Sequence, residues 1–373
     1  MRVKLKDAFN LQMGKTPSRA DLSMWGGNNK WISISDVGSA KKYISSTKEC
    51  ITDEGVSRSG IKVVPEGTVI MSFKLSIGKT AIVSEDMYTN EAIMAFIDNG
   101  TYCIDPNYLY HLCCGTDWTQ GGNKAVMGLT LNKATLSEME IELPTIEEQR
   151  EIASILDQLD AIIEKRHSEL NMIEQLVKSR FIELFGDSEF NTMQWPTEKL
   201  SELCVVSSSK RIYQNEQSTE GVPFLRISDL NERIDNVKNA PELFIPINKY
   251  NELKENGLVP TEGDILVTSR GTLGRCYIVR PEDEFYFQDG MISWLSDLSH
   301  QITSLYLSQL FAMSGIQKQI ASLQAGSTVA YLSISMLKKL DIMLPPLNLQ
   351  NQFAVFVEQT DKSKLCGAME VAA

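Results

Sequence analysis

The sequence has no long apolar segment. No stretch reaches the roughly 18 consecutive apolar residues of a membrane-spanning helix, although 43% of the 373 residues are hydrophobic. Residues 1–7 (MRVKLKD) also lack the apolar core of a secretory signal. We therefore expect a cytoplasmic protein of two to three globular domains, because 373 residues are too many for one ordinary core.

Patterns that bind metals or form disulfides are missing as well. The seven cysteines include no C-x-x-C pair, and the adjacent Cys113 and Cys114 suit neither a zinc site nor an ordinary disulfide. The three histidines, His111, His167 and His300, have neither metal-ligand nor triad spacing. We expect reduced thiols and no bound metal.

Catalytic signatures are absent or incomplete. Residues 77–80 (IGKT) look like the end of a phosphate-binding loop, but such a loop needs a glycine where Phe73 stands. No G-x-G-x-x-G motif occurs, and residues 344–347 (LPPL) do not match the Asn/Asp-Pro-Pro-Tyr/Phe motif of amino-methyltransferases. Residues 207–210 (SSSK) fit S-x-x-K only as a weak pattern in a polar loop. These absences favour a binding protein over an enzyme; a nuclease with unrecognised motifs stays an alternative.

What the sequence does contain is a long internal repeat. Residues 31–36 (WISISD) align with 225–229 (LRISD), and residues 64–72 (VPEGTVIMS) align with 259–268 (VPTEGDILVT). Across the whole unit the offset drifts only from 193 to 201 residues. One duplication of this length differs from a solenoid, whose repeats run to about 20–50 residues. It predicts two similar lobes with pseudo-twofold symmetry.

Each copy has a β-rich part followed by a helix. Apolar, β-branched runs such as 67–73 (GTVIMSF) and 263–269 (GDILVTS) predict short strands, and Gly, Ser and Asn predict the turns between them. The expected fold class is α+β, with two similar mixed β-rich domains separated by long helices of the kind that form coiled coils. The expected segments are a first domain (1–143), a long helix (144–186), a second domain (187–343) and a second, apparently truncated helix (344–373).

The first helix should be unusually long. No Pro or Gly occurs from residue 145 to residue 185, Thr145 can cap the start, and Gly186 can end the helix. About 40 residues at 1.5 Å each make a rod of roughly 60 Å. An apolar stripe of that length must contact a partner helix. We expect this contact at Ile152, Ile155, Leu159, Ile162, Ile163, Leu170, Ile173, Leu176, Val177 and Leu184.

The net charge of −12 argues, taken alone, against a nucleic-acid binder. Three stretches nevertheless contain no acidic residue: 67–84, 265–281 and 298–340. A solvated surface normally mixes charges of both signs, so stretches whose only charges are basic predict local positive surfaces on an acidic protein. Chance in strand-rich segments is the alternative explanation.

Together these segments resemble the specificity subunits of type I restriction-modification enzymes. The likeness is carried by residues 260–274 (PTEGDILVTSRGTLG), by 143–149 (LPTIEEQ) at the start of the long helix, and by 183–187 (ELFGD) at its end. Each motif is moderately specific, but their duplicated order is highly specific and spans about residues 1–361. The resemblance implies a non-catalytic subunit with two target-recognition domains, each reading one half of an asymmetric, bipartite site in duplex DNA.

The same resemblance implies partner proteins. Two methyltransferase (modification) subunits and the restriction subunits, which translocate DNA, would dock on the chain. These partners would use S-adenosylmethionine, ATP and Mg, and the chain itself would need no cofactor. The long helices would pair as an antiparallel coiled coil that sets the spacing of the half-sites. Attraction of DNA phosphates by the partners would make the net charge tolerable.

Candidate DNA contacts lie mainly in the acid-free stretches and in one Gly-rich loop. Lys and Arg suit phosphates and guanine edges, whereas Asn and Gln suit adenine. In the first domain the candidates are Ser72, Lys74, Lys79, Gly122, Asn123 and Lys124. In the second domain they are Arg226, Arg270, Thr272, Arg275, Gln324, Ser327 and Thr328. For each of them, an ordinary solvated loop residue is the alternative.

The C-terminal segment departs from the family pattern. Members continue with a second long helix, whereas residues 362–373 (KSKLCGAMEVAA) contain Gly367 and small residues in place of an apolar stripe. The long helix would then lack most of its partner within the chain, and Ile162 to Leu184 would be exposed. Three outcomes stay open: a truncated scaffold variant with impaired assembly, a protein that dimerises through the long helix, and an isolated form seen without its partners.

Overall fold

The computed structural model describes residues 1–74, 76–118, 123–125, 128–237, 239–324 and 330–369, with the backbone alone for 123–125, 128–130 and 362–369. It divides into two compact units, Met1–Arg166 (unit 1) and His167–Ala373 (unit 2). The division falls inside the long helix, so each unit contains one part of that helix. The segment 144–186, expected to stand apart from both domains, is thus shared between the two units.

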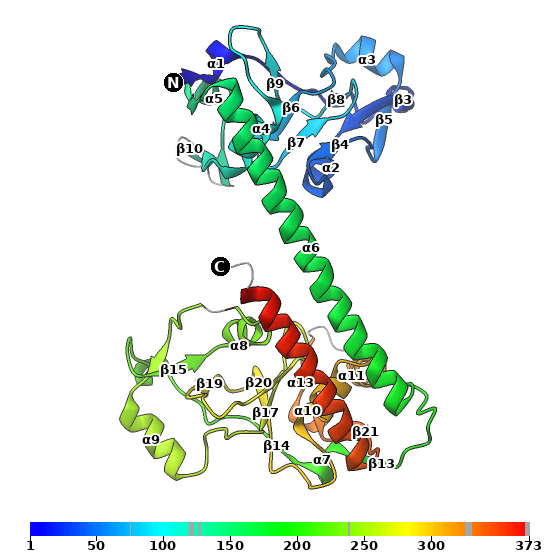
Figure 1. Cartoon of the computed structure of the whole chain (residues 1–373), viewed down its shortest axis with the longest axis vertical. Coiled ribbons are helices and arrows are strands. Elements are labelled where there is room, and N and C mark those ends of the chain that lie inside the picture. Colours follow the sequence, from blue (N-terminus) through cyan, green and yellow to red (C-terminus); the bar gives the residue numbers. More distant parts are fainter. Residues whose placement is uncertain (75, 119–122, 126–127, 238, 325–329, 370–373) are drawn as a thin grey trace. The chain divides into compact units, whose positions relative to one another are not determined.

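Unit 1 is built on three sheets and one further antiparallel pair of strands (Figure 1). The largest sheet has the strand order β2-β9-β6-β7-β4, the second is β5-β3-β8, β1 pairs with β12, and β10 with β11. Its strands are β1 (Arg2–Lys4), β2 (Phe9–Met13), β3 (Trp25–Ile32), β4 (Tyr43–Ile44), β5 (Glu49–Ile51), β6 (Val69–Ser72), β7 (Thr80–Val83), β8 (Tyr88–Thr89), β9 (Ile93–Asp98), β10 (Asn123–Ala125), β11 (Gly128–Thr130) and β12 (Glu140–Glu142). Its helices are α1 (Leu5–Ala8), η1 (Leu22–Met24), α2 (Ile34–Ser39), α3 (Asp53–Ser59), α4 (Pro106–Gly115) and α5 (Lys133–Glu138).

Unit 2 repeats most of this topology. Its sheets are β14-β20-β17-β18, β16-β15-β19 and the pair β13-β21. Its strands are β13 (Thr197–Lys199), β14 (Val205–Ser207), β15 (Val222–Leu225), β16 (Phe244–Ile245), β17 (Ile265–Thr268), β18 (Cys276–Ile278), β19 (Tyr286–Phe287), β20 (Ile292–Ser296) and β21 (Asp341–Met343). Its helices are α7 (Leu200–Leu203), η3 (Gln214–Glu216), α8 (Ile227–Ile234), α9 (Ile247–Glu255), α10 (Ser304–Phe311), α11 (Ser314–Leu323), α12 (Ile334–Leu337) and α13 (Leu347–Met369).

Three strand arrangements correspond between the two units, whereas β4, β10 and β11 of unit 1 have no counterpart among the described strands of unit 2. The order β14-β20-β17-β18 matches β2-β9-β6-β7, and β16-β15-β19 matches β5-β3-β8. The pairing β13-β21 matches β1-β12, so in both units the first strand closes against the last one. The predicted α+β class with two similar β-rich domains is therefore confirmed.

The central sheet of unit 1 is buried on both faces. Val69 and Met71 of β6 belong to one core cluster, and Ile70 between them belongs to another on the opposite face. Successive strand residues point to opposite faces, so a strand covered on both sides reads as a continuous apolar run. This is why the segment GTVIMSF lacks polar alternation.

The long helix α6 runs from Ile146 to Phe185 over 40 residues, as its lack of Pro and Gly predicted. At its start the Thr145 backbone N–H donates to the Glu148 carboxylate at 2.8 Å, and the Glu148 N–H donates back to the Thr145 hydroxyl at 3.3 Å. At its end Gly186 has φ +79°, a left-handed conformation that terminates a helix at little cost for glycine. Among the described residues, none of the helices combines the length and apolarity that a bilayer span requires.

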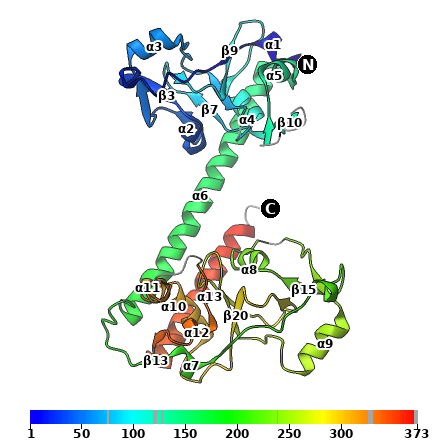
Figure 2. The ribbon, with the colours of Figure 1, turned by 180° about the vertical axis from the view of Figure 1, so that it is seen from behind.

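In unit 2 the end of α6 packs against α13, which lies beside it in both views (Figures 1 and 2). The rings of Phe181 and Phe185 lie 5.5 and 5.6 Å from that of Phe353, and both contact Tyr306 of α10. All four side chains are fully buried. Helix α13 continues to Met369, past Gly367, so residues 362–369 are helical despite their composition.

Candidate nucleic-acid interface

Two loops occupy equivalent places in the two units. Loop 1 (residues 73–79, of which 75 is not described) joins β6 to β7, and loop 2 (residues 269–275) joins β17 to β18. Loop 1 is fixed by Ser72, whose hydroxyl donates to the Ser76 carbonyl and accepts from the Lys79 N–H at 3.1 Å. Loop 2 is fixed in the same way by Thr268. The backbones of the two loops are therefore held by the same pattern of hydrogen bonds, here called the loop frame.

The first residue of each loop is hydrogen-bonded to neighbours at equivalent positions in the two units. The Phe73 N–H donates to the Ala92 carbonyl at 3.0 Å, and the Ser269 N–H donates to the Met291 carbonyl at 2.9 Å. The Phe73 carbonyl in turn accepts from Leu131, and the Ser269 carbonyl accepts from Leu332. The backbone of each loop is held by the sheet below it, which leaves the loop side chains to vary.

Ser72, one of the predicted DNA contacts, does not present its side chain to a ligand in this structure. Its side chain is completely buried and both of its hydrogen bonds are made inside the loop. Thr268, at the same place in unit 2, is also completely buried. A hydroxyl residue at the last position of an apolar strand in both copies is the sequence signal for this loop-fixing role.

In unit 1 the lysines of loop 1 are not paired with carboxylates of the described residues. No carboxylate among the described residues forms an ion pair with Lys74 or Lys79. The Lys74 ammonium lies 5.3 Å from the Phe73 ring centre. Lys79 is exposed and passes over Gly38 of α2, where an added Cβ would come within 2.6 Å of its Nζ. Because Gly38 has no side chain, nothing at this position of α2 binds the ammonium.

In unit 2 the equivalent cation is held in place. The Arg275 guanidinium donates to the Asn231 side-chain oxygen at 2.8 Å and to both carboxylate oxygens of Asp235. Asn231 on α8 occupies the position of Gly38 on α2. The prediction that residues 265–281 form an acid-free surface is therefore wrong at Arg275, because α8 supplies a carboxylate from elsewhere in the chain.

The other candidates in unit 2 differ in how freely they can contact a ligand. Arg270 is exposed, and no carboxylate among the described residues pairs with it; its guanidinium lies 3.9 Å from the Met291 sulfur. Thr272 is exposed, with its hydroxyl 3.4 Å from the Asn231 oxygen. Arg226 is half-buried at the start of α8, where hydrogen bonds to Asp229 and then Glu242 raise its pKa.

The remaining candidates lie at the limit of what the structure describes. Gln324 is half-buried at the C-cap of α11. Asn123 and Lys124 belong to β10, of which the backbone alone is described. Gly122, Ser327 and Thr328 lie outside the described residues.

Most predicted contact residues of α6 are on its surface. Two of them are not: Val177 is buried, and Leu184 is half-buried against the core of unit 2. The expectation that the stripe is exposed as far as Leu184 is therefore wrong, because α13 covers this end of α6. The exposed members are Ile152, Ile155, Leu159, Ile162, Ile163, Leu170 and Leu176, and Ile173 is partly exposed.

Comparison with known proteins identifies the family. The sequence pattern of the type I restriction modification DNA specificity domain matches residues 1–175 and again residues 193–365. The chain therefore belongs to this family, and the two matches coincide with the two copies of the repeat. The expected class, a specificity subunit without a catalytic role, is confirmed by this membership.

Individual relatives agree with the family match. The type I restriction enzyme MjaIX specificity subunit of Methanocaldococcus jannaschii is 25% identical over 379 residues, which cover 95% of this chain and 85% of the relative. The MjaVIII specificity subunit of the same organism is 24% identical over 381 residues, covering 96% and 85%. The crystal structure of the type I S subunit from M. genitalium has the same fold, with a TM-score of 0.53 and 16% identity, over 100% of this chain and 92% of that one.

Proposed function

We propose that this specificity subunit binds duplex DNA through loops 1 and 2, and that each loop reads one half of a bipartite site. Lys74 and Lys79 supply the cations of loop 1, and Arg270 and Arg275 supply those of loop 2. Lys acts as a point charge on phosphates, whereas a fixed Arg can hold two acceptors of a guanine edge. The chain acts in the cytoplasm.

The observation that carries the proposal is that loops 1 and 2 have the same backbone hydrogen bonds but present different side chains. Ser72 and Thr268 fix the backbones by equivalent hydrogen bonds. The outward residues differ, with Lys79 over a glycine in one unit and Arg275 bound to Asn231 and Asp235 in the other. A shared frame with unlike contacts is what recognition of two different half-sites requires, so the whole site is asymmetric.

A loop exchange tests this proposal directly. Residues 74–79 are replaced by the sequence of residues 270–275, which has the same length, and the chain is assembled with its methyltransferase partner. Selection from a pool of randomised duplexes should then give a changed half-site for unit 1 and an unchanged one for unit 2. The control is Thr268→Ser, which keeps the frame of loop 2 and should leave both half-sites as they are. An unchanged site after the exchange would refute the role of loop 1.

Partner docking is the second part of the proposal. Isoleucines and leucines such as Ile155, Ile163 and Leu170 are about half exposed along α6. An apolar stripe left in water is a liability that a partner surface removes. We assign this stripe to the methyltransferase subunits, with the restriction subunits joining the complex and with S-adenosylmethionine, ATP and Mg used by these partners. A second copy of the chain is the competing occupant.

A further inference from the structure

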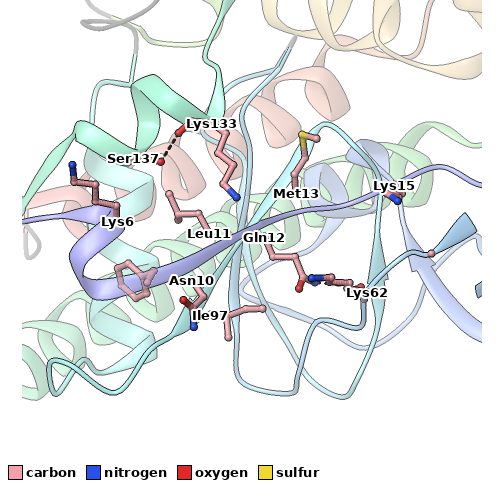
Figure 3. Close-up of a pocket in the computed structure, with 12 residues that line it drawn as sticks. Lys6, Asn10, Leu11, Gln12, Met13, Lys15, Lys62, Ile97, Lys133 and Ser137 are labelled. Carbon is pink, nitrogen blue, oxygen red and sulfur yellow. Dashed lines mark hydrogen bonds between the residues drawn. The ribbon is translucent and has the colours of Figure 1, made fainter.

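A groove runs along the outer edge of the central sheet of unit 1 (Figure 3). Its volume is about 670 Å³, and β2 forms its floor. Four lysines line it, Lys6, Lys15, Lys62 and Lys133, and no carboxylate does. Such a concentration of positive charge is unusual on a chain whose net charge is −12.

The lysines come from both sides of the strand. Figure 3 shows Lys133 and Lys6 on the side toward which Leu11 points, and Lys62 on the side of Gln12. The Gln12 amide donates to the Lys62 and Val63 carbonyls at 3.2 and 2.9 Å, which fixes that wall of the groove. Lys6 is partly neutralised by Glu138, whereas Lys62 and Lys133 form no ion pair with any described carboxylate.

The floor offers backbone donors and acceptors. β2 is the edge strand of its sheet, and β9 is its one partner among the described strands. Gly14 donates to the Ile93 carbonyl and Asn99 donates to the Ala8 carbonyl, so these positions face β9. Because hydrogen-bonded and non-bonded pairs alternate along an antiparallel ladder, the N–H and C=O groups of Leu11 and Met13 point outward into the groove. An open edge of this kind is a template for one more strand.

Unit 2 does not repeat these charges. When the two copies are aligned by their loops and strand registers, the positions of Lys6, Lys62 and Lys133 are occupied in unit 2 by Ser201, Gly257 and Ile334. Of the four lysines, Lys15 alone has a lysine, Lys210, at the equivalent position. A groove that followed DNA phosphates would be expected in both reading units, since both must neutralise a duplex. Outward carbonyl oxygens also repel phosphate, whereas the N–H groups of an added strand satisfy them.

We propose that this groove binds an extended, acidic segment of a partner protein, which adds a strand to the free edge of β2. The backbone of the segment hydrogen-bonds to Leu11 and Met13, and its carboxylates pair with lysines on both sides of the strand. The site is independent of loops 1 and 2, so it stands or falls separately from the DNA-reading proposal.

The test uses the full chain and a fluorescent peptide of three Glu-Glu-Val-Val repeats, which carries glutamates on both faces of an extended strand. Fluorescence anisotropy measures its binding, with a Lys-Lys-Val-Val peptide as the charge control. The double variant Lys62→Glu/Lys133→Glu should weaken binding of the acidic peptide at least tenfold. The matched double variant of unit 2, Lys210→Glu/Lys338→Glu, changes Lys210 and Lys338, the exposed C-cap residue of α12. It makes the same change in net charge and should bind as the wild type does.

A second pair of variants tests the added strand. Met13→Pro removes an outward N–H without removing a bond to β9, and it should also weaken binding at least tenfold. Met13→Ala keeps the N–H and should retain binding within about threefold. Absence of peptide binding by the wild type at 1 mM overturns the proposal, and so does full binding by Met13→Pro. If Lys62→Glu/Lys133→Glu instead weakens binding of an unrelated DNA duplex and not of the peptide, the groove is a phosphate track.

Discussion

Gln149 and Gln350, at equivalent places in the two copies of the repeat, make the same three hydrogen bonds. The Gln149 side-chain oxygen accepts from the Asp105 N–H at 2.9 Å, and its amide donates to the Cys103 and Pro144 carbonyls. The Gln350 oxygen accepts from the Thr303 N–H at 2.9 Å, and its amide donates to the Gln301 and Pro345 carbonyls. Both side chains are fully buried. Each glutamine thus joins the start of a long helix to the segment that precedes α4 or α10.

Removing either amide should destabilise its own unit by a similar amount. Gln149→Met and Gln350→Met keep the side-chain length but leave buried backbone groups without partners, at a cost of about 1–3 kcal/mol for each variant. Urea unfolding measures the loss. The control is Gln158→Met on the surface of α6, where the amide is exposed and makes one long bond of 3.4 Å to Ser154. A loss in one unit with none in the other would contradict their equivalence.

Lys79 and Arg275 should differ in their contribution to salt-dependent DNA binding. A lysine that neutralises one phosphate contributes about 0.9 to the slope of log affinity against log salt concentration. Lys79→Ala should therefore lower the slope by about that amount. Arg275 is already paired with Asp235, so Arg275→Ala should lower it by clearly less.

The measurement is a salt titration of the assembled complex with its cognate duplex. Arg270→Ala serves as the reference for unit 2, because Arg270 is exposed and pairs with no described carboxylate. If Arg275→Ala reduces the slope as strongly as Arg270→Ala does, the ion pair with Asp235 opens on DNA binding and the prediction fails.

Charge placed on the exposed stripe of α6 should impair assembly without unfolding the chain. Ile155 and Ile163 are each 52% exposed, so Ile155→Glu/Ile163→Glu should leave the melting temperature nearly unchanged. Recovery of methyltransferase subunits in co-purification should fall sharply. Val177→Ala should instead lower the melting temperature and leave the recovery of methyltransferase subunits nearly unchanged. Val177 is buried, and its truncation costs about 2 kcal/mol of folding stability. Light scattering of the wild type then separates the occupants: a monomer at low concentration excludes self-association through α6.

The attachment of α6 to unit 1 should weaken in acid. Asp157 of α6 accepts hydrogen bonds from Lys42 and from His111, the latter at 2.7 Å, and Asp160 lies 4.0 Å from the other ring nitrogen. Burial raises the pKa of Asp157, but the bonds from Lys42 and His111 together lower it further, to below its ordinary value of 3.8. A lowered pKa in the folded state means stability that is complete above the ordinary value and is lost as pH falls below it.

Thermal unfolding of the wild type and of Asp157→Asn checks this dependence. At pH 5 the wild type should melt at the higher temperature, and the difference should shrink as the pH falls from about 4 to about 3. Glu151→Gln, which removes an exposed carboxylate of the same helix, should show no such trend. A constant difference across this range would show that the pairing does not depend on the charge of Asp157.

Several features followed from the sequence because each depends on local order along the chain. The repeat, the class of its strands and the length of α6 are read from apolar period, turn residues and the lack of Pro and Gly. The start at Thr145 and the stop at Gly186 follow from hydrogen-bonding and conformational preferences of single residues. Gln149 and Gln350 also align in the sequence, at the repeat offset of 201 residues, but the sequence does not show which hydrogen bonds they make.

Tertiary structure decided which candidate side chains are free. Ser72 stands in a basic, acid-free stretch, yet its hydroxyl is used up inside its own loop. Arg275 has no acid near it in sequence, but α8 brings Asp235 to it in space. Val177 is buried because α13 packs on it, while Ile155 on the same helix remains exposed. The order of residues along the chain determines the fold and its two similar units. Burial and ion pairing depend on segments far apart in the chain, so the available contact surface is set by packing.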